Sequence, residues 1–281
     1  MSSVLQMVGE TFREATRRKI FLIVPVMSLA FIAIYALGNY YAFRDSSGII
    51  ASVDRQALAG ATLVGLSMFV SLFLGSALGI FLSFSLVRGD AEVGTLQQLV
   101  VRPLARRGVL IGRFLGASLV CTSYVMIMYG ISVLVTGLMG QWWPKPLLAP
   151  GITLASGVNV VIALTLLGSC FFTALSNGII MFMIYGAALL AGLLAQLGNA
   201  LNSTGLETTA RVVSRLLPFE ALYQAALDEL TAGTTGFARV IVQLGPLGGA
   251  EPGGAGLNLY VVAYVAAVLW IAVRLFERRD L

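Results

Sequence analysis

The sequence has 281 residues, of which 58% are hydrophobic and 11% charged, and its formal net charge is +5. A soluble domain carries roughly 25% charged residues, so this composition excludes an ordinary water-soluble protein. The basic residues flank apolar runs, as membrane topology requires, so we expect no nucleic-acid partner. There is no histidine, the commonest general base and metal ligand, so we expect no catalytic residue and no metal site.

Six apolar runs are long enough to cross a bilayer, because about 20 helical residues span its hydrocarbon core. The runs are continuous rather than alternately apolar and polar, which favours helices over a barrel. The sequence therefore predicts an all-α integral membrane protein, embedded in the lipid bilayer with six transmembrane helices. The predicted spans are residues 20–38, 58–86, 114–138, 152–175, 179–197 and 257–274.

An amphipathic pattern precedes the first span. Val4, Val8 and Phe12 recur at helical spacing, with Glu10 and Arg17 on the opposite face. This pattern predicts a helix over residues 4–19 that lies in the membrane interface. A plain polar flank is the alternative.

Two connections carry structural signals. Residues 176–178, Ser-Asn-Gly, form the single break between the fourth and fifth spans, which predicts a tight helical hairpin; one merged long helix is the alternative. Residues 198–256 form a long connection, in which residues 207–230 indicate one or two short helices around Pro218.

Basic residues predict the orientation. Because cytoplasmic flanks are rich in Lys and Arg, six spans place both termini in the cytoplasm and residues 198–256 outside, the latter by parity. We expect a multi-pass protein of the plasma membrane. The residues that define the cytoplasmic side are Arg13, Arg17, Arg18, Lys19, Arg88, Arg102, Arg106, Arg107, Arg113, Arg274, Arg278 and Arg279.

Small residues recur at every fourth position of two spans. Such a stripe lets another helix approach closely, which predicts either a helix interface along the substrate pathway or ordinary intramembrane packing. The residues are Ser67, Ser71, Gly75, Gly79 and Ser83 in the second span, and Ala187 and Ala191 in the fifth.

Residues 88–113 form the most polar stretch near the membrane. Val93, Leu96 and Val100 form a narrow apolar stripe, and Pro103 ends the helix that they predict over residues 91–101. A short helix tied to two spans is a suitable lever for a partner protein. A basic loop that only sets topology is the alternative.

Two absences restrict the mechanism. The only lysines are Lys19 and Lys145, and neither follows a glycine-rich loop, so the sequence has no Walker A motif for ATP. We also expect no charged side chain deep inside a span, which counts against a carrier driven by an ion gradient.

The stretch from residue 88 resembles the cytoplasmic loop of ABC-2 type permeases, the membrane subunits of type-2 ABC exporters. Members of that family have an acidic residue directly after an Arg-Gly pair, and Asp90 occupies that position here. Residues 4–19 resemble the family's elbow helix. The residues that match the loop pattern are Arg88, Gly89, Glu92, Gly94, Thr95, Leu96, Pro103, Arg106, Gly112 and Arg113.

This resemblance implies an exporter permease with no enzymatic activity of its own. Two separate ABC ATPase subunits would bind ATP and Mg²⁺, dock on a coupling helix between spans two and three, and act on a pair of permeases, as a homodimer or with a paralogue. The alternatives are a gradient-driven secondary transporter and a non-transporting membrane assembly factor. The residues expected to contact the ATPase are Asp90, Glu92, Gly94, Thr95, Gln97, Gln98, Arg102, Arg106 and Arg107.

Overall fold

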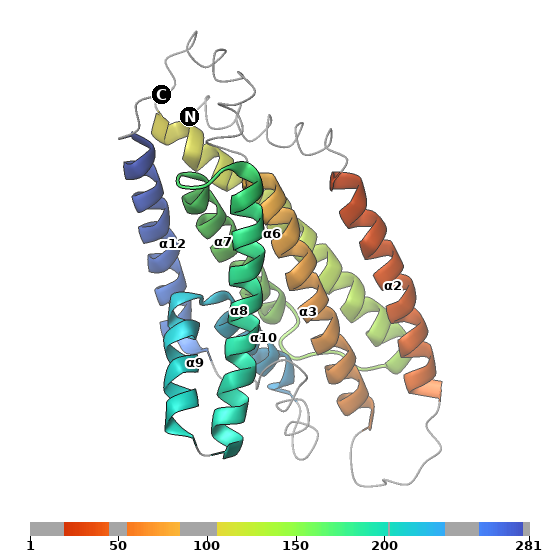
Figure 1. The fold of residues 1–281 in the computed structure, drawn as a ribbon. Helices are drawn as coiled ribbons and strands as arrows, with labels where there is room; N and C mark the ends of the chain where they lie inside the picture. The colour runs from red at the N-terminus through yellow and green to blue at the C-terminus, as the bar shows by residue number, and fades with distance from the viewer. Residues whose placement is uncertain (1–19, 45–54, 85–105, 202, 234–252, 278–281) are drawn as a thin grey trace.

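A computed structural model describes residues 20–44, 55–84, 106–201, 203–233 and 253–277 (Figure 1). Those residues form helices and no strand, so the predicted all-α fold is confirmed. The helices are α2 (Ile20–Arg44), α3 (Arg55–Ser83), α6 (Arg106–Gly140), α7 (Ala149–Ser169), α8 (Ala174–Leu201), α9 (Thr204–Leu216), α10 (Phe219–Thr231) and α12 (Gly254–Glu277).

Six of these helices, all except α9 and α10, are long and apolar enough to cross a membrane. The start of α2 and the end of α12 lie at the same end of the bundle, as an even number of crossings requires (Figure 1). We call this the terminal end. We call the opposite end, where α8 ends and α9 begins, the hairpin end.

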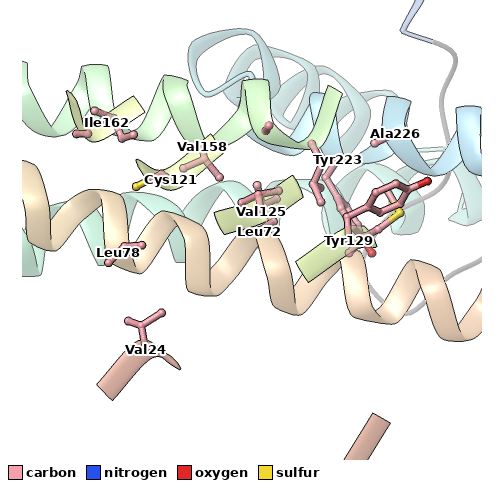
Figure 2. Packing of buried hydrophobic residues seen from close by; sticks show 14 of the residues in the cluster. Val24, Leu72, Leu78, Cys121, Val125, Tyr129, Val158, Ile162, Tyr223 and Ala226 are labelled. Atoms are coloured by element: carbon pink, nitrogen blue, oxygen red, sulfur yellow. The ribbon is translucent and has the colours of Figure 1, made fainter. Parts of the chain in front are cut away.

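Helices α3 and α7 form the centre of the bundle, and both are mostly buried by protein. Around them, α2, α8 and α12 expose most of their apolar surface. One continuous cluster joins the central helices (Figure 2), in which Leu72 of α3, Val125 of α6, Val158 of α7 and Tyr223 of α10 are all buried. The apolar outer surfaces are what a bilayer covers.

The connection between α6 and α7 closes the hairpin end. It begins at Gln141, which has a positive φ of 52°. Trp142 then packs on α3, where a Cβ added at Gly60 would lie 2.6 Å from its ring. Tryptophan is enriched at membrane–water interfaces, so this contact marks the level at which the bundle leaves the hydrocarbon core.

The break between the fourth and fifth spans is not at residues 176–178, as we expected. It lies at residues 170–173, and residues 176–178 are helical within α8. The Asn177 backbone N–H donates to the Thr173 carbonyl at 2.8 Å, so the helical hydrogen bonding of α8 already includes residue 177. The Asn177 side chain is bonded to Phe84 and Thr165 rather than to its own backbone, and so does not compete with the helix. The predicted hairpin, rather than a merged helix, is confirmed.

Two helices also extend beyond the apolar runs that predicted them. Helix α2 continues to Arg44 rather than ending at residue 38, and α6 begins at Arg106 rather than at residue 114. Polar residues continue a helix readily once it leaves the bilayer, because water then hydrates their side chains. The predicted helices over residues 4–19 and 91–101 lie outside the described residues.

Candidate functional site

Helices α9 and α10 form a hairpin that enters the bundle from the hairpin end and turns back inside it (Figure 1). Each has 13 residues, about 20 Å of helix, which is too short to cross a bilayer. The two helices flank Pro218, as the sequence predicted. We call α9 and α10 together the re-entrant hairpin.

The tip of the re-entrant hairpin lies at half the depth of the bundle. The Phe219 ring stacks on Tyr185 with centroids 5.1 Å apart, and Tyr185 lies near the middle of α8. On the other side, a Cβ added at Gly157, near the middle of α7, would lie 3.4 Å from the Phe219 carbonyl oxygen. The start of α10 is therefore held between the midpoints of two spans.

A carboxyl group is buried at this depth. Glu220 is 2% exposed and accepts a hydrogen bond from the Gln224 side-chain amide. Its carboxyl packs directly against Gly192 of α8, and a Cβ added at that glycine would collide with it. Glu220 lies in the first turn of α10, where the positive end of the helix dipole favours an acidic group.

Our expectation about charge at membrane depth concerned the spans alone, and Glu220 does not belong to a span. The spans themselves have apolar middles, but α10 brings Glu220 to the same level from the connecting segment. Hydropathy along the chain cannot reveal this, because it does not show that a connection turns back into the bundle. The feature of the sequence that could have drawn attention to this glutamate is the Pro-Phe-Glu motif at residues 218–220.

The outer helix of the hairpin, α9, packs along α8 and is fixed to α12 by two tyrosines. Tyr260 donates to the Arg215 carbonyl at 2.5 Å, and Tyr264 donates to the Leu216 carbonyl at 2.6 Å. These bonds occupy carbonyls at the end of α9, which have no partner inside the helix. Arg211 and Arg215 are exposed on the outer side of this helix.

The last turns of α10 contact α7 through a second carboxyl group. The Thr153 hydroxyl lies 3.0 and 3.1 Å from the two carboxylate oxygens of Glu229, and donates to them. Burial raises the pKa of Glu229 above its ordinary value, although the Thr153 hydrogen bond opposes this rise and Asp228 adds to it. Glu229 therefore stays protonated to a higher pH than a free glutamate.

At the terminal end, Asn177 links three helices. Its side-chain amide donates to the carbonyl of Thr165 in α7 at 3.0 Å and to the carbonyl of Phe84, directly after α3, at 3.3 Å. Asn177 itself belongs to α8 and is fully buried. One side chain therefore connects residue 84 to both α7 and α8.

A second contact at this end joins α6 to α12. Arg107, in the first turn of α6, forms an ion pair with Glu277, the last residue of α12. The described residues on either side of segment 85–105 thus contact other helices. Phe84 does so through Asn177, and Arg107 does so through Glu277.

Most residues predicted to contact an ATPase lie outside the described residues. They are Asp90, Glu92, Gly94, Thr95, Gln97, Gln98 and Arg102. Arg106 is the first residue of α6, and Arg107 is exposed and paired as described. Their role as an ATPase contact stays a prediction.

The small-residue stripe of α3 faces α6 and α7. A Cβ added at Gly75 would lie 2.6 Å from Val125 and one at Gly79 would lie 2.7 Å from Ile162, while Ser67, Ser71 and Ser83 are fully buried. These positions allow close packing within one chain. On α8, Ala191 is buried but Ala187 is exposed, so the two alanines do not share one environment. The substrate-pathway role of either set stays a prediction.

Polar contacts between α2 and α6 were not predicted, and the most buried of them involves three residues. The hydroxyls of Tyr35 and Thr136 lie 2.6 Å apart, and Thr136 donates to the Asn39 side-chain oxygen at 3.0 Å. These residues are buried. Single polar residues in an apolar run are the only sequence signal for such a contact, and they do not identify the partner.

Six helices long and apolar enough to cross a membrane, packed around a buried centre, are the features of a polytopic membrane protein. Residues 7–281 match the ABC-2 family transporter proteins, so the chain belongs to that family. It is also similar to a probable ABC transporter permease protein, NosY, of Stutzerimonas stutzeri. That similarity is 29% identity over 113 residues, 40% of this chain and 39% of NosY, so the chain spans well under half of that relative's length.

Proposed function

We propose that this chain is the permease subunit of an ABC exporter, working as a pair with a second permease and driven by separate ATPase subunits. The single observation that carries the proposal is the family match, which extends over residues 7–281. The proposed complex lies in the plasma membrane with the terminal end in the cytoplasm, because Arg107 and Arg274 lie there and the other predicted cytoplasmic arginines adjoin that end in the sequence. ATP and Mg²⁺ bind to the partner ATPases.

The contacts at the terminal end support a route for coupling. Residues 85–105 connect α3 to α6, and the ATPases are proposed to push on the helix expected at residues 91–101. A push at residue 84 reaches α7 and α8 through Asn177. A push at Arg107 reaches α12 through Glu277. Five of the six spans, α3, α6, α7, α8 and α12, are thereby connected to one loop.

The test is reconstitution of the permease with its ATPase. We expect the ATPase to co-purify with the wild-type chain, and alanine at both Asp90 and Glu92 to reduce that co-purification and the ATP hydrolysis of the complex. Glu251→Ala, in the connection proposed to lie outside, is the matched control and is expected to change neither. Equal behaviour of the two variants would contradict docking at residues 85–105.

The buried position of Glu220 supports one competing function. A carboxyl at mid-depth is typical of carriers that couple transport to an ion gradient. The discriminating experiment is transport into liposomes with a proton or sodium gradient and no ATP. Transport by the permease alone would establish a carrier, whereas dependence on ATP and the ATPase subunit supports the exporter.

A further inference from the structure

The exposed face of α9 carries two arginines within the thickness of the membrane. Tyr264, which bonds the Leu216 carbonyl, lies eight residues inside the span Gly256–Glu277, about 12 Å along its axis. Tyr260, which bonds the Arg215 carbonyl, lies about 6 Å inside it. Arg215 is therefore attached below the membrane surface, and Arg211 lies one turn closer to the hairpin end.

Arginine at this depth is costly unless an anion or water meets it, and Arg215 is the deeper of the two. Arg211 and Arg215 are four residues apart, so both guanidinium groups extend from one face of the helix. With Glu207 also present, two positive charges and one negative charge leave α9 a formal charge of +1. A guanidinium group binds phosphate or carboxylate through two parallel hydrogen bonds.

Apolar surface lies directly beside these charges. Val212 and Leu216 on the same helix are 51% and 61% exposed, and Leu197 on the neighbouring α8 is 52% exposed. The combination of cationic groups and exposed aliphatic side chains fits a molecule with an anionic head and a hydrocarbon tail. A second copy of the chain, placed here about a two-fold axis, would instead bring the arginine pair of one copy against the same pair of the other.

We propose that the Arg211–Arg215 face of α9 binds the anionic headgroup of a lipid-like molecule drawn from the bilayer. The hydrocarbon tail of this amphiphile lies against Val212, Leu216 and the outer side of α8. That the bound molecule is then exported rests on the proposed function; the binding itself does not.

Native mass spectrometry of the purified full-length permease tests the binding without an ATPase. The probes are phosphatidylglycerol, which is anionic, and phosphatidylcholine, which has the same tails and no net charge. We expect wild type to retain phosphatidylglycerol preferentially. We expect Arg215→Gln, alone or with Arg211→Gln, to reduce that preference about tenfold, the order expected for loss of a charge-assisted hydrogen bond. Arg215→Lys is expected to keep part of it.

Arg44→Gln is the matched control, because Arg44 is an exposed arginine at the same end of the bundle, on α2. The proposal is overturned if the α9 variants retain the lipid preference, or if Arg44→Gln loses it equally. Displacement of the lipid by millimolar inorganic phosphate overturns the amphiphile assignment, because it shows a simple anion site. Conversion of a dimer to a monomer by the double variant, with lipid retention unchanged, overturns it in favour of an interface between copies.

A separate arm tests transport. Phosphatidylglycerol is expected to stimulate ATP hydrolysis by the complete complex through Arg215. Binding without such stimulation would preserve the site and contradict its place on the export route, whereas failure of the ATPase to co-purify would contradict the proposed function alone.

Discussion

The two ends of the bundle are constructed differently. At the hairpin end, α10 fills the space between α3, α7 and α8, and its residues Phe219, Leu222 and Leu230 are almost completely buried. At the terminal end, helices are joined by individual polar side chains, Asn177 and the Arg107–Glu277 pair. Close packing resists deformation, whereas a few hydrogen bonds can break and re-form. From this difference we expect the polar contacts at the terminal end to break more readily than the packing of α10.

The largest expected effect comes from overfilling the hairpin end. Gly192→Ala places a methyl group where the Glu220 carboxyl lies, and so must displace this buried carboxyl and its hydrogen bond with Gln224. We expect it to destabilise the protein by about 1–3 kcal/mol, as overpacking does, measured as a fall in Tm in detergent. Gly186→Ala is the control on the same helix, because nothing lies within 4 Å of the added Cβ. Equal Tm values for the two variants would contradict tight packing of α10.

The second prediction is a loss of stability and of transport when a polar contact at the terminal end is removed. Asn177→Ala removes both hydrogen bonds that join α8 to α7 and to residue 84. Each is worth about 1 kcal/mol net, so we expect a fall in Tm no larger than the upper end of that for Gly192→Ala, but a larger loss of ATP-driven transport. Ser176→Ala, one residue away and exposed, is the control. A loss of stability without loss of transport would show that Asn177 is only structural.

A third prediction separates coupling from stability. The Arg107–Glu277 ion pair is exposed, so its loss is expected to leave Tm unchanged. Arg107→Glu is expected to reduce the ATP hydrolysis stimulated by transport, because α6 and α12 then repel each other at this end. The exchange Arg107→Glu with Glu277→Arg should restore it. If the exchanged pair stays as defective as the single variant, the contact does not transmit movement.

The smallest expected effect is a pH dependence at the hairpin end. Because the folded-state pKa of Glu229 is raised, folding favours its protonated form. Its contribution to stability is therefore full below the unfolded pKa and is lost as pH rises through the folded pKa. Glu229→Gln should flatten the dependence of Tm on pH above the pKa of an unfolded glutamate. Thr153→Val should shift the loss to higher pH, because it removes the hydrogen bond that lowers this pKa.

The sequence predicts the spans well because bilayer thickness sets their length directly. It predicts contacts between them poorly, since the partner of a polar side chain depends on three-dimensional packing. Residues 176–178 are turn-forming in water, yet Asn177 is helical here because two carbonyls from other helices accept its hydrogen bonds. Likewise, the sequence indicates the short helices around Pro218. It does not indicate that they turn back into the bundle, because that depends on packing against Gly192 of α8.

The short length of α10 has a consequence for biogenesis. Thirteen residues with Glu220, Asp228 and Glu229 among them cannot partition into lipid by themselves. Helix α10 packs against α3, α7 and α8, all of which precede it in the chain. Insertion of α10 must therefore follow assembly of those three spans. A chain that misassembles them would leave this acidic helix at the membrane surface, where quality-control proteases can reach it.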